Sequence, residues 1–99
     1  MKPTYDTDVL VLGSGLAGSV AALCLVRQGL RVMILDQGTH PRFALGESTT
    51  TPSSLWLKVL AERFDVPELH NISTGEGIRR HVAPTSGVKS NFGFLYHEK

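Results

Sequence analysis

Cysteine is almost missing from this chain, because Cys24 is the only one among 99 residues. A single thiol allows no disulfide within the chain, which excludes the small secreted domains that disulfides hold together. The neighbours of Cys24 are leucine, alanine and valine, so we interpret it as a buried, unreactive thiol. A chain of this kind is expected in a reducing compartment, and we predict a cytoplasmic protein.

An excess of charge of either sign is also missing. Lysine and arginine number 10, aspartate and glutamate number 9, and the formal net charge is +1. This balance predicts no nucleic-acid partner, and the short basic cluster at 79–81 is interpreted as a solvated face. The histidines at 70, 81 and 97 lack the spacing of metal ligands, so no metal is predicted. With 41% hydrophobic and 19% charged residues, the composition is that of one globular unit at most.

A long uninterrupted hydrophobic run is the third absence. The stretch Val9–Val26 comes nearest, but glycines and serines interrupt it, and two aspartates precede it where a signal peptide would carry basic residues. A membrane-spanning helix needs about 20 predominantly apolar residues. We therefore predict neither a signal peptide nor a membrane span, and no membrane partner.

The first third of the chain has the pattern of a βαβ unit. The run Asp8–Leu12 predicts a short, fully buried strand of a parallel sheet. The segment Leu16–Gln28 predicts a helix that ends at Gly29, and Arg31–Asp36 predicts a second buried strand. The crossover between two such strands is expected to be right-handed.

A G-x-G-x-x-G sequence lies between the first strand and the helix, as Gly13, Gly15 and Gly18. The first glycine permits the tight turn, the second lets a pyrophosphate approach the helix N-terminus, and the third lets the helix pack closely on the strand. Asp36 ends the second strand, where a carboxylate accepts hydrogen bonds from a ribose diol and repels a 2′-phosphate. The other positions assigned to this site are Ser14, Leu16, Ala17 and Gln37.

These positions together predict an adenine dinucleotide site. The alternative is a glycine turn required only by packing, with Asp36 as a surface carboxylate. The pattern does not separate FAD from NAD, because both cofactors use it.

The remaining chain contains fewer regular patterns. Residues 37–51 predict a long loop, and Thr51 as N-cap with Pro52 predicts a helix to about Phe64. The segment Val66–Thr85 is expected to be irregular, and Asn91–His97 alternates like a half-buried strand. The apolar face expected of the helix consists of Leu55, Val59, Leu60 and Phe64. The side chains expected on one side of the last strand are Phe92, Phe94 and Tyr96, and Trp56 is expected to pack.

Two later stretches, "PRFALGESTTTP" (Pro41–Pro52) and "GVKSNFGFLYH" (Gly87–His97), add to the glycine pattern. With it, they make the chain resemble the N-terminal part of flavin-dependent halogenases and their halogenase-like monooxygenase relatives. The resemblance implies FAD as the cofactor, with its ADP moiety at the glycine turn and Asp36. It also implies an α/β fold: a partial Rossmann-type FAD-binding domain (a βαβ unit plus a further helix and strand) of a larger flavoprotein, with residues 1–99 an incomplete domain.

The same resemblance assigns roles to later residues. The loop 37–51 would strap across the flavin through Gly46, Glu47, Ser48 and Thr49. Lys89 matches the lysine that receives hypohalous acid, formed from halide and a flavin hydroperoxide, and directs it to an aromatic carbon. Arg42 either reaches the diphosphate or is a surface arginine. The implied partners are a halide ion, a separate flavin reductase and a phenolic or carrier- or peptide-bound aromatic substrate.

Two other functions remain open from the sequence. One is a hydroxylase or reductase on the same flavin fold, and the other is a truncated, non-catalytic nucleotide-binding fragment. The family's W-x-W-x-I-P motif and catalytic glutamate would lie beyond residue 99. We therefore expect residues 1–99 alone to be weakly stable and without turnover, because sheet edges and one core face would be exposed.

Overall fold

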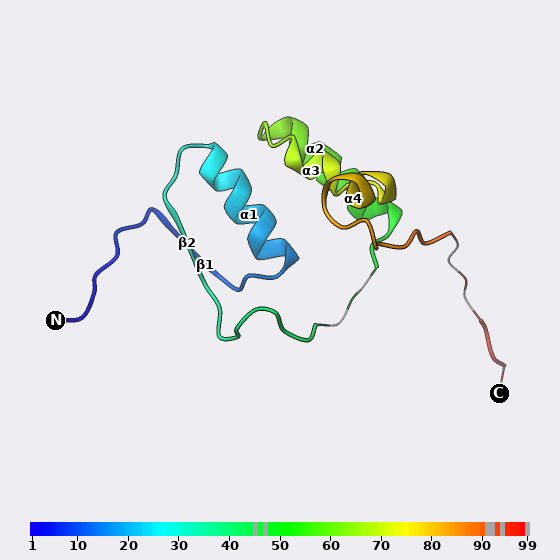
Figure 1. Ribbon diagram of the computed structural model, residues 1–99, viewed down its shortest axis with the longest axis horizontal. Coiled ribbons are helices and arrows are strands. Elements are labelled where there is room, and N and C mark those ends of the chain that lie inside the picture. The colour runs from blue at the N-terminus through cyan, green and yellow to red at the C-terminus, as the bar shows by residue number, and fades with distance from the viewer. Residues whose placement is uncertain (45, 47, 91–92, 94, 99) are drawn as a thin grey trace.

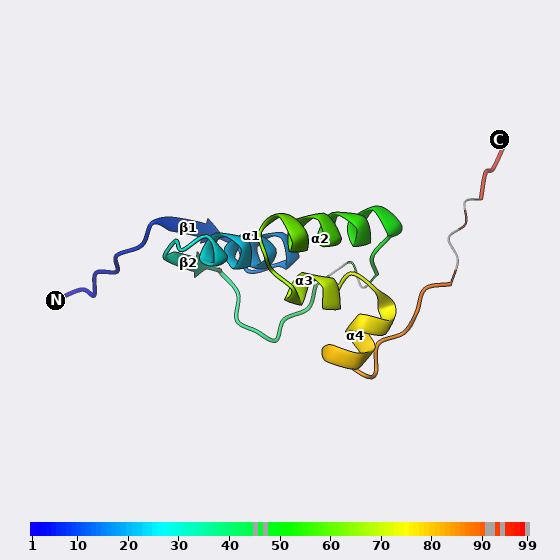
Figure 2. The same cartoon turned by 90° about the horizontal axis from the view of Figure 1, so that it is seen from above.

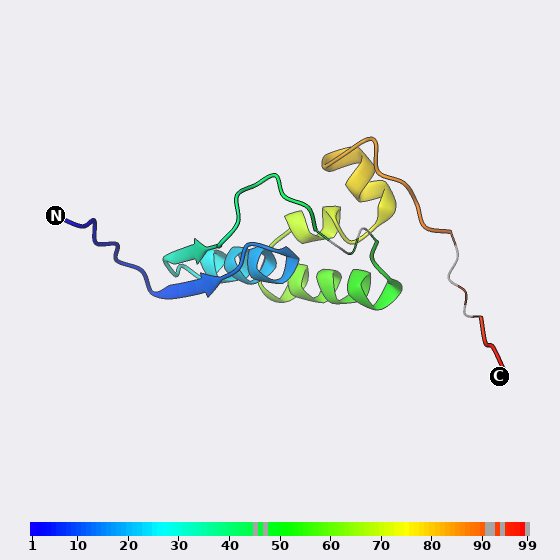
Figure 3. The ribbon, with the colours of Figure 1, turned by 90° about the horizontal axis from the view of Figure 1, so that it is seen from below.

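The structure is a computed structural model, which describes residues 1–44, 46, 48–90, 93 and 95–98. Two parallel strands and one helix form one half of the molecule, and three helices form the other, as Figure 2 and Figure 3 show. Both terminal segments extend away from this body in Figure 1. Among the described residues, none of the helices is long and apolar enough to span a bilayer.

The βαβ unit consists of β1 (Val9–Leu12), α1 (Leu16–Arg27) and β2 (Val32–Leu35). The strands pair in parallel, with Val9 opposite Val32 and Leu12 opposite Leu35. Helix α1 ends where Gly29 adopts a φ of +86°, a conformation that glycine reaches without steric cost. The predicted unit is therefore confirmed, with every boundary within one residue.

The expectation that both strands are fully buried is wrong. In β1 the side chains alternate between half-buried and exposed, and Leu10 and Leu12 are 49% and 77% exposed. In Figure 1 all the helices lie on one side of the two strands. The opposite face of the sheet therefore has no covering layer among the described residues.

The core of the second half joins α1 to α2 (Thr51–Arg63) and α3 (Glu68–Asn71). Its buried members are Cys24, Leu57, Ala61, Val66 and Leu69. The prediction that Cys24 is buried is confirmed. Burial raises the pKa of its thiol, which disfavours the reactive thiolate. Arg27 of α1 also pairs with Glu68 of α3, so the two halves are linked by charge as well as by packing.

The predicted face of α2 is only partly right. Leu60 and Phe64 pack against the core, but Leu55 is 61% exposed and Leu57 is 7% exposed. Val59 and Trp56 also lie at the surface. Helix α2 packs against α1 and α3 through Leu57 and Ala61. The positions of α1 and α3 therefore determine which side of α2 is buried. The N-cap is Thr50, one residue before the predicted Thr51.

The expectation of an irregular segment over Val66–Thr85 is also wrong. The segment contains α3 and α4 (Gly75–His81), which Figure 1 shows close to α2. Thr74 caps α4, because its Oγ1 accepts a hydrogen bond of 3.0 Å from the Gly77 N–H. An acid in the first turn of α4 and bases in its last turn complement the helix dipole. This charge pattern is visible in the sequence and could have predicted the helix.

The predicted strand Asn91–His97 is not found in the described residues. Gly93 and residues 95–97 lie outside any strand, while Asn91, Phe92 and Phe94 lie outside the described residues. In Figure 1 the described residues near the C-terminus, 95–98, lie away from the sheet. The described part of the segment therefore has no neighbouring strand that could satisfy its backbone hydrogen bonds.

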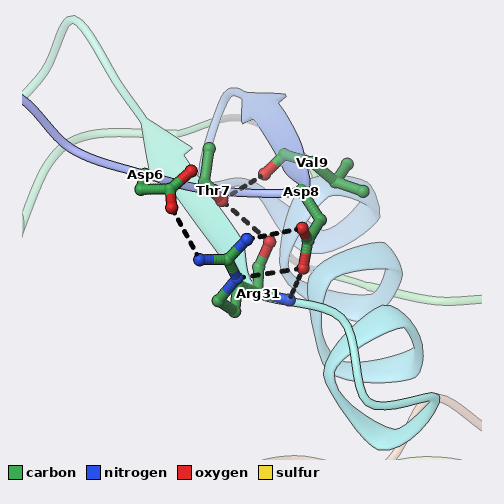
Figure 4. Close-up of polar contacts among 5 residues, drawn as sticks. All are labelled: Asp6, Thr7, Asp8, Val9 and Arg31. Atoms are coloured by element: carbon green, nitrogen blue, oxygen red, sulfur yellow. Dashed lines mark hydrogen bonds and ion pairs between the residues drawn. The ribbon is translucent and has the colours of Figure 1, made fainter.

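Arg31 links the N-terminal ends of the two strands, as Figure 4 shows. Its guanidinium donates to both carboxylate oxygens of Asp8, at 2.8 and 3.2 Å, and to Asp6 at 2.9 Å. The Arg31 N–H also donates to Asp8, and the Thr7 hydroxyl donates to the Arg31 carbonyl at 2.8 Å. These contacts hold the register of the strands at the end opposite the glycine turn.

The Arg31 cluster predicts an acid-sensitive part of the stability. The hydrogen bonds from the Arg31 side chain, then its backbone N–H, hold the pKa of Asp8 below the ordinary value of 3.8. A lowered folded-state pKa stabilises the fold above the unfolded value, and this contribution disappears as pH falls through the folded value. We expect the melting temperature of the unmodified chain to fall more steeply than that of Asp8→Asn below about pH 4. Parallel curves for the two proteins would contradict this role.

The position of the core predicts a contrast between two leucines of one helix. Leu57→Ala should lower the free energy of unfolding by about 2–5 kcal/mol, the usual cost of deleting a buried leucine side chain. The matched control, Leu55→Ala, removes the same atoms from an exposed position and should cost less than about 0.5 kcal/mol. Urea denaturation followed by circular dichroism measures both, and equal losses would show that the buried stripe is misassigned.

Candidate dinucleotide site

Two glycines of the turn after β1 are required by the fold itself. Gly13 has a φ of +102°, and its N–H donates to the Leu35 carbonyl at 2.7 Å. A Cβ at Gly18 would lie 2.1 Å from the Gly13 carbonyl oxygen, which is far inside contact distance. Helix α1 therefore packs directly against the turn, as the sequence predicted for these two positions.

Gly15 is different, because no described residue of the chain requires a glycine there. Its φ is −72°, and a Cβ would meet only the Arg42 Nη2 atom, at 4.0 Å. Gly15 is the N-cap of α1 and provides no side-chain cap for the helix N–H groups. These N–H groups are therefore open to an external anion, and a residue without a side chain lets a pyrophosphate approach them.

Asp36 follows β2 directly and lies beside the turn. Its Oδ2 accepts hydrogen bonds from the Ser14 hydroxyl and the Ser14 N–H, both at 2.7 Å, and its Oδ1 accepts from the Gly38 N–H at 2.7 Å. The Ser14 hydroxyl, then the N–H groups of Gly38 and Ser14, hold the pKa of Asp36 far below 3.8, and the Arg42 charge acts in the same direction. The carboxylate is therefore ionised and acts only as an acceptor at neutral pH.

A hollow of about 840 Å³ opens beside Asp36, and neither Ser14 nor Gly15 lines it. Of the assigned residues, Gly13, Asp36, Gln37 and Arg42 line it. Leu16 and Ala17 begin α1 and are exposed, but neither lines this hollow. The hollow contains an anionic acceptor and a cationic guanidinium beside the amide end of a helix, which is the donor and acceptor set that an ADP moiety requires.

A second hollow, of about 510 Å³, brings the loop after β2 to Lys89. Ser48, Thr49 and Lys89 share its lining, with further hydroxyls from Thr50, Thr51, Ser54, Ser73, Thr74 and Ser86. Gly46 has a φ of +92°, and Glu47 lies outside the described residues. Apolar side chains of Ile72, Ile78 and Val88 complete the lining, so residues 40 positions apart in the sequence border one hollow of mixed polarity.

Sequence reasoning missed His40. Its Nε2 atom lies 2.6 Å from the Ser14 hydroxyl, so it belongs to the glycine turn although 26 residues separate the two. The only available indication was its place four residues after Asp36. In the described part of the chain, no group of three histidine, cysteine or acidic side chains is arranged to hold a metal ion.

Comparison with known proteins agrees with this geometry. Residues 8–81 match the family described as the FAD binding domain. The chain belongs to this FAD-binding family. The halogenase PltM, in a crystal structure, superposes with a TM-score of 0.73 at 43% identity, over 77% of this chain and 15% of PltM. Another PltM crystal structure is a complex with FAD.

Two curated halogenases also match. Monodechloroaminopyrrolnitrin halogenase PrnC of Pseudomonas fluorescens is 41% identical over 92% of this chain, and tetracycline 7-halogenase of Kitasatospora aureofaciens is 41% identical over 91%. This FAD-binding chain spans 16% of the length of either relative. It is homologous to the N-terminal FAD-binding region of flavin-dependent halogenases, and FAD is its cofactor, as the sequence predicted.

The glycine geometry predicts that two similar substitutions fail for different reasons. Gly18→Ala should destabilise the fold, because its methyl group would collide with the Gly13 carbonyl. Gly15→Ala should leave the melting temperature almost unchanged, because its methyl group would only touch the Arg42 Nη2 atom at 4.0 Å. It should weaken FAD binding by at least about tenfold, because the methyl group would stand where the pyrophosphate is expected to approach the helix. Thermal unfolding without FAD and titration of flavin fluorescence separate the two effects. Unaltered FAD affinity in Gly15→Ala would refute the assigned pyrophosphate position.

Proposed function

We propose that the protein containing this FAD-binding chain is a flavin-dependent halogenase that acts on an electron-rich aromatic ring. The observation that carries this proposal is the second hollow, where Lys89 lies with Ser48 and Thr49. An ammonium group beside the loop that follows the dinucleotide site is suited to receive an oxidant generated at the flavin. The similarity to the named halogenases supports the same reaction class.

The chain's part in cofactor binding follows from its contacts. The N–H groups at the start of α1 would bind the pyrophosphate, and Arg42 would neutralise part of its charge. Asp36 would accept hydrogen bonds from the adenosine ribose. When bound, reduced FAD supplies the electrons that activate oxygen, and a separate flavin reductase would deliver it.

Lys89 would act on the oxidised halogen. Its ammonium carries three N–H donors and no acceptor, so it can hold the oxygen of hypohalous acid and direct the halogen toward the ring. The surrounding hydroxyls of Ser48 and Thr49 can donate or accept hydrogen bonds to the same small molecule. We propose a phenolic or carrier- or peptide-bound ring as the substrate and a halide ion as the co-substrate.

Replacement of Lys89 tests the proposal in the full-length protein. Lys89→Ala should reduce halogenation by at least about a hundredfold, the usual scale for loss of a catalytic proton donor, and should leave FAD bound. Lys58→Ala is the matched control, because Lys58 is an exposed lysine on α2 outside the hollow. The measurements are halide-dependent product mass and the flavin absorbance of the purified protein. Normal halogenation by Lys89→Ala would refute the lysine role, and halide-independent hydroxylation by the unmodified protein would refute the halogenase.

A further inference from the structure

The carboxylate of Asp36 has less free acceptor capacity than a ribose diol needs. A carboxylate offers about four lone-pair positions, two on each oxygen. Oδ2 already accepts two hydrogen bonds from Ser14, and Oδ1 accepts one from Gly38. One position remains, on Oδ1, whereas the two hydroxyls of a ribose require two. A bound adenosine therefore gains both hydrogen bonds only if one of the internal donors leaves.

The Ser14 hydroxyl is the internal donor that can leave. The two N–H donors belong to the backbone, but the hydroxyl proton turns about the Cβ–Oγ bond to any acceptor within reach. His40 Nε2 lies 2.6 Å from the Ser14 Oγ and accepts that proton when the ring's other nitrogen carries the hydrogen. Arg42, which lines the hollow beside Asp36, has no acceptor and cannot do the same.

We propose that His40 is a positioning residue for recognition of the adenosine ribose by Asp36. In the free protein the Ser14 hydroxyl donates to Asp36 Oδ2 and its oxygen accepts a hydrogen bond from the His40 Nε2–H. On binding, the imidazole releases its Nε2 proton to solvent and takes up one at Nδ1, and the Ser14 hydroxyl turns to donate to the Nε2 atom. Oδ2 then accepts one ribose hydroxyl while Oδ1 accepts the other. The inference rests on the proposed placement of the ribose at Asp36 and adds a residue that the glycine pattern does not contain.

Competition with nucleotides tests this in the full-length protein. FAD binding is measured by flavin fluorescence, and ADP, 2′-deoxy-ADP and 3′-deoxy-ADP displace it. The unmodified protein should bind each deoxy nucleotide about tenfold more weakly than ADP, because each lacks one hydrogen bond to a charged acceptor. In His40→Phe, which removes the acceptor, at least one deoxy nucleotide should bind as tightly as ADP. His40→Gln, which keeps an acceptor, should preserve both preferences, that for ADP over 2′-deoxy-ADP and that for ADP over 3′-deoxy-ADP.

Ser14→Ala is the control that separates a role through the hydroxyl from any other role. Without that hydroxyl Asp36 Oδ2 is already available, so Ser14→Ala should keep both preferences. The double variant Ser14→Ala with His40→Phe should then show the same two preferences as Ser14→Ala alone. Thermal unfolding of each variant without nucleotide verifies that the fold is retained.

The possible failures are distinguishable. Absence of FAD and ADP binding by the unmodified protein would refute the dinucleotide site itself. Two further results would leave that site in place and overturn the role of His40: unchanged preferences in His40→Phe, or a preference lost on adding His40→Phe to Ser14→Ala. A preference of the unmodified protein for only one ribose hydroxyl would overturn it as well.

Discussion

The close packing of α1 against the turn after β1 is the constraint on which the rest of the site depends. A single methyl group at Gly18 would lie 2.1 Å from the Gly13 carbonyl oxygen. This contact sets the position of the helix N-terminus relative to the carboxyl ends of both strands. Since β2 is parallel to β1, Asp36 emerges beside that N-terminus, and its carboxylate meets the Ser14 N–H at 2.7 Å. The helix N–H groups proposed to bind the pyrophosphate and the carboxylate proposed to bind the ribose are thus placed by one packing contact.

The two ends of the βαβ unit use polar groups for different purposes. At the N-terminal ends of the strands, Arg31 binds the carboxylates of Asp8 and Asp6, so this cluster is structural. At the carboxyl ends, Asp36 is held ionised by internal donors, and one of them, the Ser14 hydroxyl, has a second acceptor within reach. At this second end a hollow of about 840 Å³ lies beside Asp36.

The differences between expectation and structure have a common physical origin. The glycine turn, α1 and the strands were predictable because they depend on contacts within about 20 residues and on backbone conformations special to glycine. The buried stripe of α2 was not, because Leu57 is selected over Leu55 by the positions of α1 and α3. The apolar strands predict a sheet buried on both faces, yet the helices of the described chain cover only one face. The α4 helix was predictable from Thr74 and the charges that follow it, but the glycines around it obscured the pattern.

By itself the sequence determined the kind of cofactor site, because the spacing of Gly13, Gly15, Gly18 and Asp36 allows one local geometry around a pyrophosphate and a ribose. The family resemblance adds a prediction that the loop at 46–49 and Lys89 belong to the same site. Only the tertiary structure decided which of these groups meet: Lys89 with Ser48 and Thr49 in one hollow, and His40 with the Ser14 hydroxyl. The proximity of these residues depends on how whole elements pack, since residues 26 to 40 positions apart come close only when the helices and strands are assembled.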